Sequence, residues 1–331
     1  MNSGNSRFNY FLNQLQPILA AAVKQKNPAL WLYRNNARTP LFMLEALAKM
    51  YAGFHNGKRF DKMREHFKLL EDILGAIDYY DTVAKNLVTN KKIPASVVTY
   101  LQAQSREKIQ SLNEALTEHD WLLPDNNRIA KIQKKLSEAD WKNEETEIQL
   151  MNEWYGESIY GIVEFCQAKQ FRFDNMEADV HELRRKLRWL SIYPQAVRGT
   201  VQFGKNKTVP KHLLKYATKE IVSSPFNKMP NAGTAKHILL LEQNYYYALS
   251  WMIQELGNLK DNGLHVLAVK EAIQQSSSMS EEDALKKSYQ MLGRQQSRLP
   301  ALLDQASEIC KVYFKEQNLE HLVIGPTSVK G

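Results

Sequence analysis

The chain has 331 residues, of which 44% are hydrophobic and 24% are charged, and its formal net charge is +8; this balance predicts a globular protein with a sizeable core. No apolar run approaches the roughly 20 residues of a membrane span, and the N-terminal residues lack a secretory pattern, so a cytoplasmic protein is expected. Cys166 and Cys310 lie far apart and outside any zinc-site spacing, which predicts two buried free thiols.

Apolar residues at helical spacing predict helices throughout the first 140 residues. Their expected ranges are 7–25, 29–51, 59–88, 94–119 and 127–136. Pro40 should kink the second of these helices, because it cannot donate a hydrogen bond to the carbonyl of Asn36. Gly75, inside the third, indicates a close packing contact.

The helical pattern then starts again. Further helices are expected at 146–169, 179–195, 235–260, 281–292 and 299–316. A basic insertion at 197–236 interrupts this series, with a short helix predicted at 211–222. The insertion contains eight basic residues and a single acidic one, Glu220. The basic residues are Arg198, Lys205, Lys207, Lys211, Lys215, Lys219, Lys228 and Lys236. Because few stretches alternate with period two, the predicted fold is all-α.

The helix expected at 179–195 has two contrasting faces. Its cationic side chains fall on one narrow face and are His181, Arg184, Arg185 and Arg188. Leu183, Leu187 and Leu190 fall on the opposite face and should enter the core. The cationic face is either an ordinary solvated surface or a binding surface for an anion.

A similar arrangement occurs earlier in the chain, which indicates an internal duplication. Residues 30–38 align with 180–188, which places Arg34 on Arg184 and Arg38 on Arg188. Downstream, residues 74–77 align with 256–259. We therefore predict two helical-bundle repeats, at 1–140 and 141–331, with the basic insertion in the second.

These residues resemble the conserved histidine α-helical domain, or CHAD, family. That family pairs a basic helix of the form His-x-x-Arg-x-x-x-Arg with a later Leu-Gly-x-Leu-x-Asp helix, and here His181, Arg184 and Arg188 precede Leu256-Gly257-Asn258-Leu259-Lys260-Asp261. The first copy departs from the pattern, with Trp31 in the position of the His and Tyr79 in that of the Asp. The resemblance implies two four-helix bundles related by a pseudo-twofold axis, whose basic helices face a shared groove that binds inorganic polyphosphate. It also implies association with polyphosphate granules.

The residue types suit such a ligand. Arginine offers a planar fork of donors that meets two phosphate oxygens at once, and lysine adds mobile positive charge. The predicted polyphosphate-binding residues, for which phosphate or sulfate ions would be mimics, are Arg34, Arg38, His181, Arg184, Arg185, Lys186, Arg188 and Lys236. His181 is either a structural residue or a pH-dependent contact to the anion.

Other functions have weaker sequence support. No catalytic residue, cofactor or metal site is expected, because the chain lacks the P-loop, the nucleophile elbow and the His-Glu-x-x-His motif. A metal-dependent phosphohydrolase would need carboxylates such as Asp78 with Asp81 or Glu255 with Asp261, although surface ion pairs explain such acids more often. Nucleic-acid binding could use tyrosines 245–247 as stacking surfaces beside Lys236. A scaffold that docks an acidic protein is a further alternative.

Overall fold

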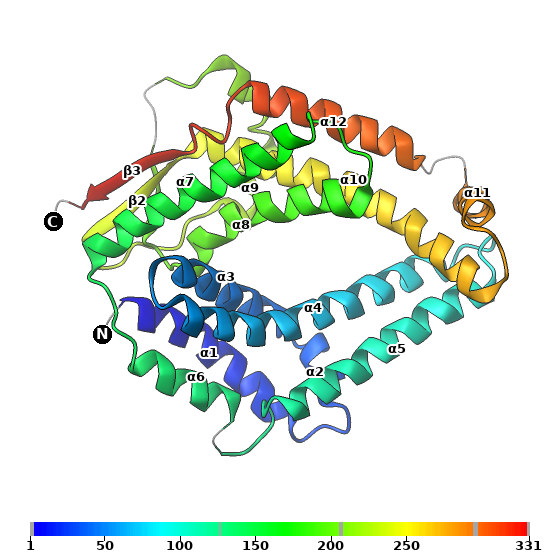
Figure 1. Ribbon diagram of the computed structural model, residues 1–331, viewed down its shortest axis with the longest axis horizontal. Helices are drawn as coiled ribbons and strands as arrows, with labels where there is room; N and C mark the ends of the chain where they lie inside the picture. The colour runs from blue at the N-terminus through cyan, green and yellow to red at the C-terminus, as the bar shows by residue number, and fades with distance from the viewer. Residues whose placement is uncertain (1–2, 126, 205–207, 294–296, 330–331) are drawn as a thin grey trace. The chain divides into compact units, whose positions relative to one another are not determined.

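The computed structural model describes residues 3–125, 127–204, 208–293 and 297–329, and it is predominantly helical (Figure 1). The chain divides into two compact units. Unit 1 comprises Met1–Trp141 and His265–Gln296, and unit 2 comprises Lys142–Leu264 and Ser297–Gly331. Across the described ranges, no helix combines the length and the apolar composition needed to cross a membrane.

Unit 1 is a bundle of helices in which α3 packs on α4, α4 packs on α5, and α1 packs on α3. Its helices are α1 (Ser3–Ala22), α2 (Pro28–Arg34), α3 (Arg38–Phe54), α4 (Gly57–Leu87), α5 (Ala95–Glu118), α6 (Arg128–Ser137), α11 (Glu281–Leu292) and the last part of α10 (Gln243–Ser276). Asparagine side chains cap the starts of α2, α4 and α6 by accepting hydrogen bonds from backbone amides of the first turn.

The chain breaks between α2 and α3, where one kinked helix was predicted for residues 29–51. The break falls at residues 35–37, where Asn36 has a φ of 55° in the left-handed region that asparagine tolerates. Pro40 lies in the first turn of α3, where a missing backbone N–H breaks no intrahelical hydrogen bond. The prediction of a kink at Pro40 was therefore wrong, because the position of the proline favours a helix start.

The two units are not simple halves of the sequence. Two repeats were predicted at 1–140 and 141–331, whereas the first change of unit falls after Trp141 and residues 265–293 belong to unit 1 again. The end of α10 supplies four buried residues to an apolar cluster with the end of α4 and the start of α5. The cluster includes Ala268, Val269, Ala272 and Ile273 with Val83, Leu87, Val97 and Leu101. Burial of this apolar stripe assigns the end of α10 to unit 1.

Unit 2 combines helices with a small sheet. Its elements are α7 (Glu144–Ala168), the π-helix η1 (Met176–His181), α8 (Glu182–Ala196), β1 (Val201–Gly204), the 3₁₀ helices η2 (Lys211–Lys215) and η3 (Pro225–Asn227), α9 (Lys219–Ser223), β2 (His237–Glu242), the first part of α10, α12 (Leu299–Lys315) and β3 (Val323–Ser328). Helix α7 packs against β2 and β3. Cys166 and Cys310 are both buried and unbonded, as predicted, and burial raises the pKa of the Cys166 thiol to about 12.

The predominantly helical structure is consistent with the all-α prediction, and a small three-stranded sheet accompanies the helices of unit 2. Strand β2 lies between its neighbours, parallel to β1 and antiparallel to β3, with Leu239 paired to Val201 on one side and to Pro326 on the other. A single helix was predicted for 235–260, yet residues 237–242 form a strand and α10 runs on to Ser276. A short apolar run such as His-Ile-Leu-Leu-Leu-Glu fits a strand or a helix equally well. These residues form a strand because their backbone pairs with β1 on one edge and with β3 on the other.

Candidate functional site

Helix α8 has the two faces predicted from the sequence. Leu183, Leu187 and Leu190 are fully buried, while Arg185 is 56% exposed. Glu182, in the first turn, lies 2.6 Å from the Arg185 guanidinium and 3.6 Å from the Lys186 ammonium. One carboxylate is thus shared between two cations, which leaves this face of α8 positively charged.

His181 ends the π-helix η1 directly before α8. Its Nδ1 lies 2.6 Å from Oε2 of Glu177, one turn earlier. The hydrogen bond from His181 lowers the pKa of the Glu177 carboxyl. His181 therefore has an intramolecular partner, and an anion that binds the imidazole would do so beside this carboxylate.

Arg184 lies against a glycine of α10. A Cβ at Gly257 would stand 3.0 Å from Nε of Arg184 and 3.5 Å from one of its terminal nitrogens. Nε also donates to the carbonyl of Ile253 at 3.3 Å. Burial lowers the pKa of the guanidinium, and the charge of Asp261 opposes this shift. Arginine stays charged in proteins. Over the described parts of the chain, no carboxylate lies within 4.0 Å of Arg184.

Arg38 makes the corresponding contact in unit 1, but with acidic partners. A Cβ at Gly75 of α4 would stand 2.7 Å from a terminal nitrogen of Arg38. Nε donates to Oε1 of the buried Glu71 at 2.8 Å, and the guanidinium lies 3.5 Å from Asp78. Two carboxylates therefore offset the charge of Arg38.

The glycine contacts give a different correspondence between the two units from the one read off the sequence. In each unit the arginine Nε bonds to the residue four positions before the glycine, which is Glu71 before Gly75 and Ile253 before Gly257. Arg38 thus makes in unit 1 the contact that Arg184 makes in unit 2, whereas the alignment placed Arg34 on Arg184. The shift is about one helical turn, which a short repeat of basic residues cannot distinguish. Asn35, rather than Trp31, then stands at the position of His181.

The remaining predicted residues lie on several elements. Arg34 is exposed at the end of α2 and helps to lower the pKa of Asp81, after the hydrogen bonds from Lys85 and Tyr33. Arg188 is partly buried on α8, one turn beyond Arg184. The structure thus gathers His181, Arg184, Arg185, Lys186 and Arg188 on one continuous helical segment.

The basic insertion is built differently from the α8 face. Lys205 and Lys207 lie outside the described residues. Lys215 is 2.5 Å from Glu316 and 4.8 Å from the ring centre of Tyr216, so it anchors the insertion to the end of α12. Lys236 is exposed directly before β2, and its backbone amide donates to Glu144. Instead of the helix predicted at 211–222, η2 and α9 occupy this stretch.

The carboxylates considered for a phosphohydrolase have partners within the chain. Asp78 pairs with Arg38, Asp81 accepts from Tyr33 at 2.8 Å, and Asp261 pairs with Lys260. Among the residues that could be described, no group of three or more His, Cys, Asp or Glu side chains could hold a metal ion. Tyr245 and Tyr246 are buried, which removes them as stacking surfaces for bases.

The sequence interpretation overlooked the groups that hold the arginines. Glu71, Asp78, Ile253 and Glu182 were not predicted as partners. The available signal was the spacing of four residues between Glu71 and Gly75, which puts both on one face of a helix.

The chain matches no family model, no curated protein and no solved structure.

Proposed function

We propose that this protein binds inorganic polyphosphate, without catalysing a reaction, on the cationic face of α8. The observation that carries the proposal is the environment of Arg184. Its guanidinium is held by Gly257 and Ile253, and no carboxylate of the described chain lies within 4.0 Å. A fixed, partly buried cation of this kind gains most from an anionic ligand that replaces its lost hydration.

A polymer of phosphates fits this helix because the cations recur along it. Arg184 and Arg188 are one turn apart, a separation of roughly 6 Å, so one linear phosphate chain that runs along the helix could contact both side chains. Arg185 and Lys186 flank them and share Glu182. Arginine would supply paired hydrogen bonds to phosphate oxygens, and lysine would supply mobile charge at the rim.

The proposal includes a weaker second site in unit 1, with Arg34 and Arg38. Glu71 and Asp78 already offset Arg38, so a phosphate there must compete with two carboxylates. We propose further that the repeated contact between an arginine and a helix glycine reflects the internal duplication and the CHAD resemblance. Localisation to polyphosphate granules in the cytoplasm would follow from that function.

Competition between long-chain polyphosphate and RNA at matched phosphate concentration tests the proposal. Labelled polyphosphate bound to the full chain should be displaced by unlabelled polyphosphate at a concentration at least about tenfold below that of RNA, because RNA phosphates are more widely spaced and each carries a sugar. Equal displacement by RNA would replace this proposal with general polyanion binding. Release of phosphate in the presence of divalent metal ions would instead indicate a phosphohydrolase.

A further inference from the structure

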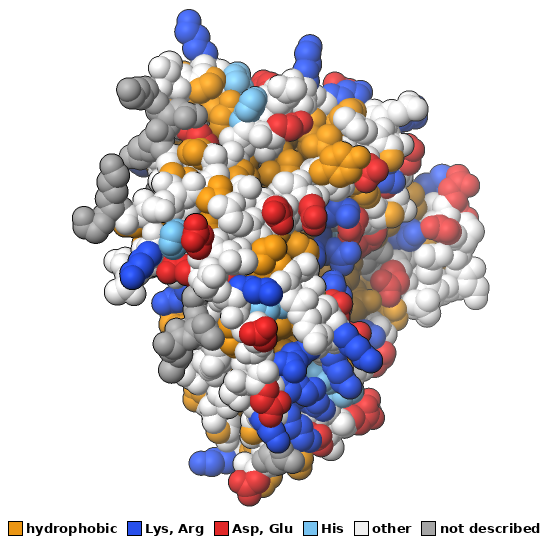
Figure 2. Space-filling view, turned by 60° about the vertical axis from the view of Figure 1, so that its left-hand side comes forward, with side chains coloured by type: hydrophobic (Ala, Val, Ile, Leu, Met, Phe, Trp, Pro, Cys, Tyr) orange, Lys and Arg blue, Asp and Glu red, His pale blue; other side chains and the backbone are white. Residues whose placement is uncertain are grey.

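Unit 1 carries a second group of basic side chains, on helices α4 and α6. We define the α4–α6 cluster as Arg59, Lys62 and His66 of α4 together with Arg128 and Lys135 of α6. On α4 they recur at spacings of three and four, which places them on one helix face. Figure 2 shows a face of the molecule on which Lys and Arg side chains gather beside histidine in the lower part of the view.

Two contacts join the helices across this cluster. Arg59 donates to the backbone carbonyl of Lys135 at 3.3 Å, and Arg128 lies 3.2 Å from Nε2 of His66. The start of α4 therefore meets the end of α6, and the two helices run in opposite directions. Their cationic faces form two facing rows of side chains.

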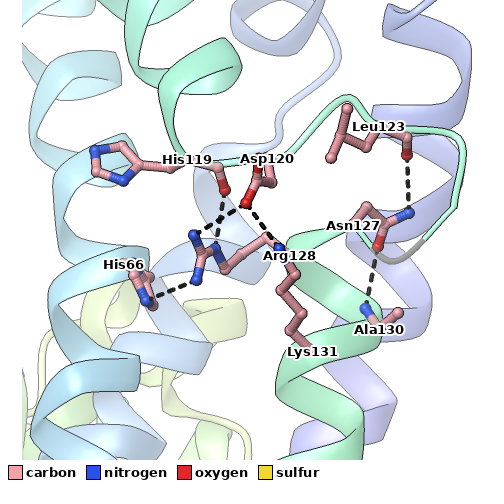
Figure 3. Close-up of polar contacts among 8 residues, drawn as sticks. All are labelled: His66, His119, Asp120, Leu123, Asn127, Arg128, Ala130 and Lys131. Carbon is pink, nitrogen blue, oxygen red and sulfur yellow. Dashed lines mark hydrogen bonds and ion pairs between the residues drawn. The ribbon is translucent and has the colours of Figure 1, made fainter.

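Arg128 fixes the geometry at one end of the cluster, as Figure 3 shows. Its Nε donates to the carbonyl of His119 at 2.9 Å, and one terminal nitrogen lies 3.8 Å from Asp120. Asp120 is held in turn by Lys131 at 2.8 Å. Because Arg128 can only donate, Nε2 of His66 accepts, and the proton of the neutral ring lies on Nδ1.

Positive charge around His66 exceeds negative charge. The pKa of His66 is lowered to about 4, first by burial and then by Arg128, His119, Lys135 and Lys62. The carboxylate of Asp120 lies next to this group of cations, and it forms ion pairs with Lys131 and Arg128. The ring centroids of His66 and His119 lie 6.1 Å apart, so two imidazole rings and several cations meet at one place.

We infer that the α4–α6 cluster binds a linear oligophosphate of two or three phosphoryl groups. From Arg59 to His66, and from Arg128 to Lys135, each row extends about 10 Å along its helix, which matches the length of a triphosphate. Arg128, 16% exposed, would hold one end with fixed donors. Lys62 and Lys135 are exposed and would follow the rest of the chain with mobile charge.

This inference does not depend on the function proposed for α8, because its residues lie on other helices and in unit 1. It also has its own chemical signature. A bound phosphate next to His66 favours the imidazolium, so ligand binding should raise the pKa of His66 from its lowered value of about 4. The titratable and charged groups beside His66 are Lys62 from α4, His119 directly after α5, and Arg128 and Lys135 from α6, with Asp120 held against Arg128.

The test uses the full chain with Arg184→Gln, which removes the central contact of the α8 proposal. Tripolyphosphate is titrated by calorimetry, and the imidazole resonances of His66 and His119 are followed by NMR. Lys62→Glu with Lys135→Glu should weaken binding by at least about tenfold, because two charge-assisted contacts become repulsive. Lys91→Glu with Lys92→Glu is the matched control, since both lysines are exposed in unit 1 and outside the cluster.

The expected result is saturable binding with shifts of both imidazole resonances, which the control pair retains and the cluster pair loses. ATP should bind as tripolyphosphate does, because the cluster reads the phosphate chain. The inference would be overturned if ATP bound tightly and tripolyphosphate did not bind. It would also be overturned if the imidazole resonances did not shift at saturation. If polyphosphate did not bind α8, the expected binding of tripolyphosphate to the α4–α6 cluster would be unchanged. Each proposal can therefore be contradicted without the other.

Discussion

The guanidinium of Arg184 lies on Gly257, where a Cβ would stand 3.0 Å from Nε, and the guanidinium of Arg38 lies on Gly75, where a Cβ would stand 2.7 Å from a terminal nitrogen. Both glycines are inside long helices, where glycine costs about 1 kcal/mol relative to alanine. The space they leave holds an arginine close to a helix backbone in each unit. The two arginines differ in what surrounds them, since Arg38 has two carboxylates nearby.

Gly257→Ala should separate binding from stability. The new Cβ displaces Arg184 by a few tenths of an ångström and lengthens its bond to Ile253, while alanine favours the helix by about 1 kcal/mol. We expect polyphosphate affinity to fall severalfold while the thermal midpoint stays within a few degrees. Gly161→Ala on α7 is the control, because a Cβ there meets nothing within 4 Å. Equal loss of affinity in both variants would show that the contact with Arg184 is irrelevant.

Arg38→Gln should lower stability more than Arg184→Gln does, whereas Arg184→Gln should lower polyphosphate affinity more. Removing Arg38 leaves the buried Glu71 without its 2.8 Å partner, which should lower the free energy of unfolding by about 1–3 kcal/mol. Removing Arg184 leaves no buried carboxylate without an ion-pair partner, so the loss in free energy of unfolding should stay below about 1 kcal/mol. Its effect on polyphosphate affinity should be larger than that of Arg38→Gln. Urea denaturation of both variants measures the difference, and a larger loss for Arg184→Gln would contradict this description.

Glu45 should make unit 1 less stable at neutral pH. Burial, and then repulsion from Glu71, raises the pKa of Glu45 from 4.5 to about 7. Because the folded state then binds more protons than the unfolded state between these values, stability should fall as pH rises through this window, by about 3 kcal/mol at most. Glu45→Gln should flatten the slope between pH 5 and pH 8 in urea denaturation. Parallel pH profiles for the two proteins would exclude this role.

Ile273→Ala should weaken unit 1, although residue 273 follows most of unit 2 in the sequence. Ile273 is 3% exposed in the apolar cluster with the end of α4 and the start of α5, and its truncation should cost about 2–4 kcal/mol. Hydrogen exchange should accelerate in peptides covering residues 83–101. Acceleration confined to residues 142–264 would show that the end of α10 belongs with unit 2.

Periodicity in the sequence predicted most helices and the buried face of α8, because Leu183, Leu187 and Leu190 repeat at helical spacing. It missed β2, whose apolar run is ambiguous until Val201 and Pro326 pair with it. It also missed that the end of α10 completes unit 1, since apolar residues do not specify their partner. The one-turn shift between Arg34 and Arg38 became visible through contacts with Gly75 and Gly257.

The most direct test of the central claim compares labelled long-chain polyphosphate binding to the unmodified chain and to Arg184→Gln, by fluorescence anisotropy at several salt concentrations. We predict that the substitution weakens binding by at least about tenfold, a typical loss for a charge-assisted contact to phosphate, and lowers the slope of log affinity against log salt by about one. The same affinity and slope in both proteins would contradict the assignment of polyphosphate binding to α8.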